Sequence, residues 1–179
     1  MLQTGFAETF AAARTGADWA WARLYREYAP ALLGFLRGRG ADDAENVLGE
    51  VFLQAVRDLH GFDGGEPEFR AWLFTIARHR AIDEARRRKR RPEQLVAEGP
   101  DDAVCFDEPL AGLSGEWLRG IIEQLSRDQR DVLLLRLVGD LTVDDVARAL
   151  GKSPGAVKAL QRRGLETVAR ELAAQGVTL

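Results

Sequence analysis

A proline- and glycine-containing acidic segment divides the chain and limits what it can fold into. Residues 92–113 hold three prolines and two glycines among six acidic residues, with no Lys or Arg. Neither helical nor strand periodicity is present there, and this composition is typical of a flexible linker. The sequence therefore predicts two small domains, residues 1–91 and 114–179, joined by a flexible acidic linker at residues 92–113.

The first part of the chain has the apolar spacing of helices. The pattern predicts four of them, at residues 2–14, 17–37, 42–59 and 67–91. The third has the clearest 3.6-residue stripe, which includes Val56, and Asp42 with Glu45 resembles a capping box at its start. The fourth places Phe69 and Trp72 on its apolar face, and a basic run follows on the same helix.

The second part of the chain predicts four shorter helices. The first lies between Ser114 and Leu125. Capping patterns mark the other three starts, at Ser126 with Gln129, Thr142 with Asp145, and Ser153 with Pro154. No alternating strand pattern is present, so the predicted fold class is all-α, with two small helical domains.

Charge is strongly segregated along the chain. The net charge is only −3, yet residues 78–91 carry eight basic and two acidic residues, a net +6. Residues 92–116 carry seven acidic residues and no basic one, a net −7. Such segregation indicates several different partner surfaces rather than one uniformly basic nucleic-acid binder.

Several classes of protein are excluded by what the sequence lacks. No carboxylate is paired with a candidate nucleophile or a glycine-rich phosphate loop, so we expect no enzyme, no cofactor and no small-molecule substrate. Cys105 is the single cysteine and His60 and His79 the only histidines, so no metal site is expected. No apolar run is long enough for a membrane span, and the first residues have neither the basic region nor the apolar region of a signal peptide. We therefore expect a cytoplasmic protein.

The most specific motif is a helix-turn-helix pattern at residues 143–162. Ala147 allows close helix crossing, Gly151 suits the turn, and Val157 and Leu160 would lock the second helix. The exposed face of that helix is predicted to bind DNA through small residues and cations, namely Ser153, Gly155, Ala156, Lys158, Ala159 and Arg162. An ordinary helical hairpin with solvated cations is the alternative.

The basic run in the first domain has two interpretations. It could bind nucleic acid, or it could be a solvated helix end that stabilises the helix dipole. Trp72 could stack on an unpaired base or pack in the core, whereas Phe69 fits the core better. His79 fits a base contact and an inert surface position about equally well.

Three segments in this order resemble one family. They read DDAENVLGEVFLQAV from residue 42, FRAWLFTIARHRAIDEARRRKRR from residue 69 and LTVDDVARALGKSPGAVKALQRRGLETV from residue 141. The chain resembles a bacterial RNA polymerase sigma factor of the sigma-70 family, extracytoplasmic-function (ECF) type. The resemblance covers nearly the whole chain and implies a protein that binds core RNA polymerase and promoter DNA.

The resemblance also implies roles for individual residues. It places core polymerase binding at Glu45, Val47, Glu50 and Phe52. It places recognition and opening of the −10 element at Trp72, Arg78, His79, Arg80, Arg86 and Arg87, with capture of a flipped base by the loop at residues 60–66. It adds Arg163 to the −35 contacts of the second helix. The acidic linker would thread a basic channel of the polymerase, and an anti-sigma factor is an implied partner.

Two other functions compete with this interpretation. A one-component helix-turn-helix regulator would bind duplex DNA by itself, and predicts a ligand-binding or dimerisation domain at the N-terminus. The first domain has neither a pocket motif nor a heptad pattern. A helical adaptor that binds only protein would leave Lys158, Arg162 and Arg163 without a role.

Overall fold

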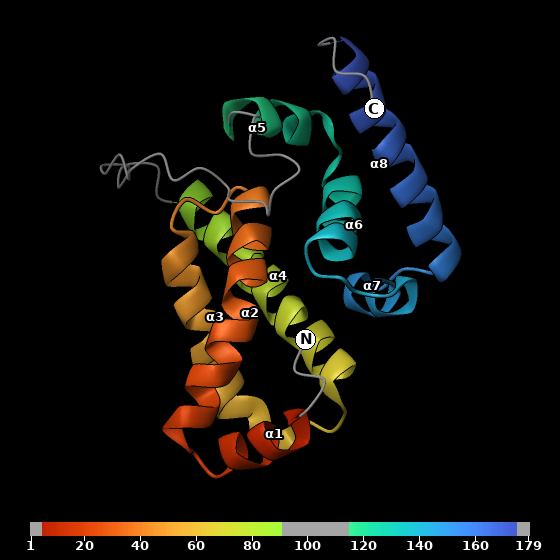
Figure 1. Ribbon diagram of the computed structural model, residues 1–179. Helices are drawn as coiled ribbons and strands as arrows, with labels where there is room; N and C mark the ends of the chain where they lie inside the picture. Colours follow the sequence, from red (N-terminus) through yellow and green to blue (C-terminus); the bar gives the residue numbers. More distant parts are fainter. Residues whose placement is uncertain (1–4, 91–114, 175–179) are drawn as a thin grey trace.

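All regular elements in the described part of the chain are helical. The computed structural model describes residues 5–90 and 115–174, which form two groups of helices (Figure 1). The elements are α1 (Phe6–Arg14), α2 (Asp18–Gly38), α3 (Ala44–Asp58), the 3-10 turn η1 (Leu59–Gly61), α4 (Glu66–Arg90), α5 (Gly115–Gln124), α6 (Arg127–Leu137), α7 (Val143–Leu150) and α8 (Pro154–Ala174). The all-α prediction is confirmed, while the predicted linker and Cys105 lie outside the described residues.

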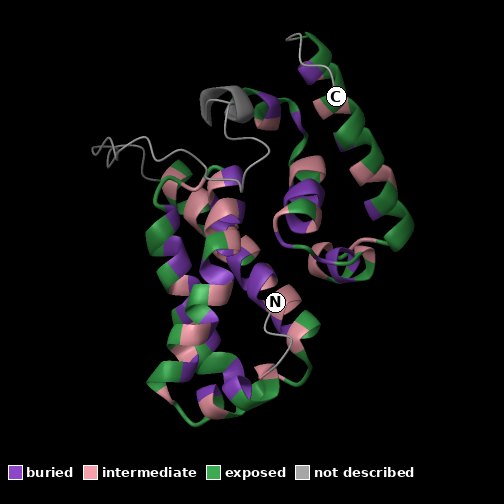
Figure 2. Cartoon of the chain, in the orientation of Figure 1, coloured by how far each residue is buried: buried purple, intermediate pink, exposed green. Residues whose placement is uncertain are grey.

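The core of the first group lies between α2, α3 and α4 (Figure 2). The apolar stripe predicted for α3 faces it, with most of its members buried: Val47, Leu48, Val51, Phe52, Ala55 and Leu59. Val56 is an exception, because it is 46% exposed. An amphipathic helix buries only one face, so Val56 lies at the boundary where that face ends.

An aromatic cluster joins α1 and the turn after α3 to the start of α4. Phe69 is fully buried at its centre, and its ring centroid lies 5.5 Å from that of Phe10 and 5.7 Å from that of Phe62. Tilted and edge-on pairs such as these add stabilisation beyond the buried area. The prediction that Phe69 belongs to the core is confirmed.

The N-terminus of α3 begins one residue later than the sequence pattern predicted. Asp43, not Asp42, caps the helix, and its carboxylate accepts a 3.0 Å hydrogen bond from the backbone N–H of Asn46. Asp42 instead forms an ion pair with Arg88 on α4. The predicted capping box between Asp42 and Glu45 is therefore wrong, because a tertiary ion pair engages Asp42.

The second group is organised by well-formed helix ends. Ser126 with Gln129 and Thr142 with Asp145 form complete capping boxes at the starts of α6 and α7, as predicted. Each box satisfies backbone N–H groups that have no partner within the helix. These caps fix where α6 and α7 begin and therefore fix the turns between them.

A glycine lets α8 pack closely against α6. Gly164 is buried, and a Cβ atom built on it would lie 2.9 Å from Cδ1 of Leu133, closer than real Cβ contacts allow. Gly120 on α5 is the opposite case, because no other helix in the described part of the chain lies within 4 Å of a Cβ built there. The α6–α8 distance is thus set by the absence of a side chain at Gly164.

We expect Gly164→Ala to lower the free energy of unfolding by about 1–2 kcal/mol, because the added methyl group overpacks the contact with Leu133. Gly120→Ala is the matched control, and should be neutral or stabilising by up to about 1 kcal/mol through helix propensity. Urea denaturation followed by circular dichroism measures both. Equal effects of the two substitutions would contradict this account of the packing.

Candidate nucleic-acid and polymerase interfaces

Helices α7 and α8 form the predicted helix-turn-helix. Gly151 ends α7 in the left-handed conformation, with φ of 62°. Residues that carry a Cβ rarely adopt this backbone conformation. The hydroxyl of Ser153 then accepts a 3.2 Å hydrogen bond from the N–H of Ala156 and caps α8. Ala147 and Val157 are buried where the two helices meet. Turn, cap and crossing are therefore all as the sequence predicted.

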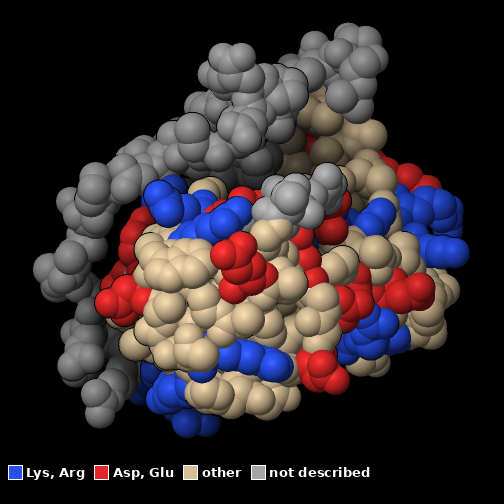
Figure 3. Space-filling view, turned by 60° about the horizontal axis from the view of Figure 1, so that its bottom comes forward, with Lys and Arg blue, Asp and Glu red and all other residues tan. Residues whose placement is uncertain are grey.

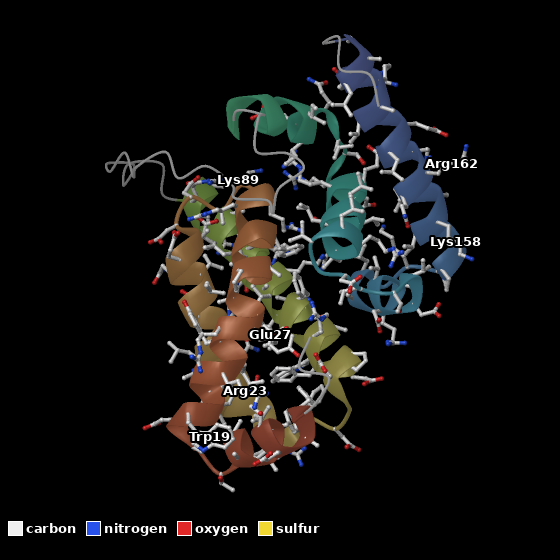
Figure 4. All side chains as sticks on the ribbon, viewed as in Figure 1. Trp19, Arg23, Glu27, Lys89, Lys158 and Arg162 are labelled. Atoms are coloured by element: carbon white, nitrogen blue, oxygen red, sulfur yellow. The ribbon has the colours of Figure 1, made fainter. Side chains whose placement is uncertain are left out.

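The predicted DNA-binding residues line the solvent side of α8. Lys158 and Arg162 point away from α6 (Figure 4). Six of the seven predicted residues are exposed and only Ala159 is half-buried; the exposed ones are Ser153, Gly155, Ala156, Lys158, Arg162 and Arg163. Small side chains in the first turn leave room for a groove edge, and the cations follow one turn later. This is the arrangement that a recognition helix needs.

The cations of this face have few competing partners. Nη1 of Arg162 lies 3.2 Å from Oε1 of Glu166, and Nε of Arg163 donates to the carbonyl of Ala159 at 3.3 Å. Within residues 5–90 and 115–174, Lys158 forms no ion pair. The pair of Arg162 and Glu166 is largely exposed, and such pairs contribute little stability. Lys158 and Arg162 can therefore turn to a base or a phosphate at a small cost in free energy.

The six residues predicted to bind the −10 element occupy three different faces of α4. Trp72, His79 and Arg86 are spaced seven residues apart and so share one face. His79 and Arg86 are exposed on it, while Trp72 is half-buried with its ring centroid 5.1 Å from that of Phe62. This face presents one aromatic ring and two groups that can bind nucleic acid to solvent.

Arg80 and Arg87 face α3 instead. Nε of Arg80 donates a 3.0 Å hydrogen bond to Oε1 of Gln54, and Glu50 lies 3.7 Å from Arg80 and 3.5 Å from Arg87. Glu50 is mostly buried between the two helices. These ion pairs join α3 to α4, so Glu50, predicted as a polymerase contact, is engaged inside the domain.

Arg78 occupies the third face, which is turned towards the second group of helices. Its Nε donates a 3.1 Å hydrogen bond to Oδ2 of Asp131 on α6. Periodicity within α4 gave no indication of this partner, because the two residues are 53 positions apart. The −10 set predicted from the sequence is therefore not a single surface in this structure.

Two of the predicted polymerase contacts are core residues. Val47 is 1% exposed and Phe52 is 8% exposed, so neither side chain presents a surface to a partner. Both belong to the buried stripe of α3. Glu45 is exposed, and its own backbone N–H and the Arg37 guanidinium, 2.6 Å away, lower the pKa of its carboxyl group.

Sequence reasoning missed an exposed apolar surface further along α3. Leu53 is 64% exposed and Val56 is 46% exposed, both on α3. Leu53 lies off the buried stripe, at a position where a polar residue is usual, and this was the signal that the sequence offered. Exposed apolar residues grouped on one helix indicate a protein contact.

On one face of the molecule, the charged residues do not form a continuous basic surface. On the face shown in Figure 3, Lys and Arg side chains are interspersed with Asp and Glu. In the described part of the chain, no three His, Cys, Asp or Glu residues are placed to hold a metal ion. Across the same residues, none of the helices combines the length and apolar character of a membrane span.

Together the fold and the exposed face of α8 define a helical DNA-binding protein with two domains. Comparison with known families assigns both parts: residues 24–91 match Sigma-70 region 2, and residues 115–168 match Sigma-70, region 4. The chain thus carries two different sigma-factor regions in order.

Characterised relatives are similar over most of the chain. The ECF RNA polymerase sigma factor ShbA of Streptomyces griseus is 32% identical, over 85% of this chain and 83% of the relative. The ECF RNA polymerase sigma factor RpoE of Cereibacter sphaeroides is 30% identical, over 86% of each chain. BldN of Streptomyces coelicolor is 33% identical over 89% of this chain, which spans 63% of the length of BldN.

A solved structure supports the same fold. CnrH in complex with the cytosolic domain of CnrY superposes with a TM-score of 0.71, covering 96% of this chain and 99% of that one, at 24% identity. The chain belongs to the ECF sigma factors of the sigma-70 family. It is a non-catalytic subunit that binds core RNA polymerase and promoter DNA and directs transcription initiation.

We expect Val47→Arg to lower the free energy of unfolding by about 3 kcal/mol or more, because it places an unpaired charge in the core. Leu53→Arg on the same helix should change it by less than about 0.5 kcal/mol, because that side chain is solvated. Thermal and urea denaturation measure the difference. A folded, fully stable Val47→Arg variant would contradict the assignment of Val47 to the core.

Proposed function

We propose that α8 reads the −35 element of the promoter and that the solvent face of α4 recognises and opens the −10 element. The observation that carries this proposal is the exposed helix-turn-helix face, with Lys158 and Arg162 one turn apart on the same side of α8. Arg163 lies about 100° further round the helix and would contact phosphate. The three cations therefore have separable roles.

On α4, the proposal assigns different roles to the three faces. Trp72, His79 and Arg86 would contact unpaired or flipped bases, since an aromatic ring and cations on one surface suit single strands. Arg80 and Arg87, paired with Glu50, would mainly hold α4 against α3 and neutralise nearby phosphates. Arg78 can contribute only after it leaves Asp131.

For the polymerase contact, we propose the exposed side of α3. Glu45 supplies a solvated carboxylate, and Leu53 with Val56 supplies apolar area that water leaves on binding. Val47 and Phe52 support this surface from below. Glu50 acts indirectly, because its pairs with α4 fix the position of α3.

Domain limits and setting complete the proposal. The first domain would comprise residues 1–91 and the second residues 114–179, with residues 92–113 threading a basic channel of the polymerase. The protein would act in the cytoplasm, where the polymerase works. Related proteins have been solved with anti-sigma factors, such as RpoE with NepR from Bartonella quintana, and we propose a regulator of this type as a partner.

The −35 assignment predicts distinct effects for three alanine variants. Lys158→Ala and Arg162→Ala should each cost about 1–3 kcal/mol and relax preference at one −35 position if they contact a base edge. Arg163→Ala should weaken all sequences alike and reduce the salt slope by about one. Arg170→Ala, also exposed on α8, is the control. Transcription by reconstituted holoenzyme from promoters altered at each −35 position measures these effects, and unchanged −35 preference in all three would refute the assignment.

The α3 assignment predicts that Leu53→Arg weakens binding to core polymerase by at least about tenfold in Kd. The substitution places a charge where the complex would bury the apolar Leu53 side chain. Ala11→Arg, exposed on α1, should bind as the parent does. Fluorescence anisotropy of labelled protein titrated with core enzyme gives both constants. Equal affinity of the two variants would move the contact away from Leu53.

A further inference from the structure

The two domains are in direct contact, and the contact is centred on one carboxylate. Asp131 on α6 is only 4% exposed. It accepts from Arg39, which follows α2, and from Arg78 on α4, whose Nε lies 3.1 Å from Oδ2. Both arginines belong to the first domain, and their side chains are mostly buried. Such charge-assisted hydrogen bonds are geometrically specific, and loss of one partner leaves a buried charge uncompensated.

Glycines bring the helices on either side of this carboxylate close together. A Cβ atom built on Gly38 of α2 would lie 2.7 Å from Cδ2 of Leu134, and one built on Gly34 would lie 3.4 Å from Cγ1 of Val138. Gly139 meets Phe74 of α4 in the same way, at 3.2 Å. Buried residues of both domains form one continuous apolar core. The contact is therefore packed like an interior.

The charge balance of the contact depends on Asp131. Arg130 lies beside Asp131, and burial, followed by the positive charge of Arg39, lowers the pKa of Arg130. The Arg130 guanidinium itself donates to the carbonyl of Ile122, so Asp131 accepts from two guanidinium groups and lies near a third. Removal of that carboxylate would leave like charges facing one another in a poorly solvated place, which costs free energy.

In the closed arrangement the chain is too short to reach both promoter elements at once. The −35 and −10 elements are about 25 base pairs apart, or roughly 85 Å at about 3.4 Å per base pair. A compact chain of this length has a radius of gyration of about 16 Å and is roughly 40 Å across. The closed state also holds Arg78 away from DNA. Both elements can be bound together only after the domains separate.

We propose that Arg39, Asp131 and Arg78 form a latch that holds the two domains in a closed state, and that this state withholds the chain from promoter DNA until core polymerase separates them. The claim that the closed state prevents promoter binding rests on the proposed −35 and −10 roles. The claim that the closed state exists does not. A ligand that binds only the open state shifts the population towards it.

Two variants open the latch by different means. Asp131→Asn removes the charge, and Gly38→Leu places a side chain where Leu134 lies without changing any charge. Asp128→Asn on the same helix is the charge control, because its 2.8 Å partner Lys152 lies in its own domain. Gly120→Leu is the steric control, because within the described residues no other helix lies within 4 Å of a Cβ built there. Circular dichroism verifies that each variant is folded.

The distance between domains tests the closed state. Spin labels at Ala11→Cys and Ala169→Cys, with Cys105→Ser in the background, report it by double electron–electron resonance in the full chain. The parent and both controls should give one narrow distance, and both latch variants a broader and longer distribution. Core polymerase should lengthen the distance in the parent. A broad distribution in the parent, or narrow ones in both latch variants, would overturn the latch.

The affinity of the isolated chain for promoter DNA tests whether the closed state prevents binding. Both latch variants should bind a promoter duplex at least about threefold more tightly than the parent, because a larger fraction is competent to bind. The controls should bind as the parent does. Separated domains with unchanged affinity would overturn the withholding. Adding Lys158→Ala to the two latch variants tests the DNA assignment separately. This substitution should abolish their increase in promoter affinity and leave the distance between the domains unchanged.

Discussion

The burial of one face of α4 constrains every other side chain on that helix. Phe69, Leu73 and Phe74 are fully buried, and successive residues of an α-helix are rotated by about 100°. The arginines further along α4 are therefore directed to different neighbours. Some point to solvent, some to α3 and Arg78 to α6. A run of basic residues that looks uniform in the sequence thus becomes three surfaces with different neighbours.

Periodicity and capping residues predicted most of the local structure, because both depend on neighbours within one turn. The caps at Ser126 and Thr142 and the turn at Gly151 are such cases. Exposure was harder to predict at the edge of a stripe, where Val56 is solvated although Val47 is buried. A family motif marks positions that matter without telling whether a side chain contacts a partner or supports the helix that does.

The contact between the domains could not be predicted from the sequence, for a physical reason. Asp131 is a carboxylate, which is ordinarily solvated, and its partners are 53 and 92 positions away. Nothing in the spacing around it indicates burial. Glycines at the ends of α2 and α6 similarly resemble helix terminators, whereas Gly38 and Gly139 also allow close approach of the other domain.

The close packing of α8 on α6 has a mechanical consequence. Gly164 brings the recognition helix against Leu133, two residues along α6 from the carboxylate that contacts the first domain. Because the two helices are too close to slide past each other, α6 and α8 should move as one rigid body. Torque applied to α8 as DNA bends would then be transmitted to the far side of α6, and the domain would respond to the shape of its DNA as well as to its sequence.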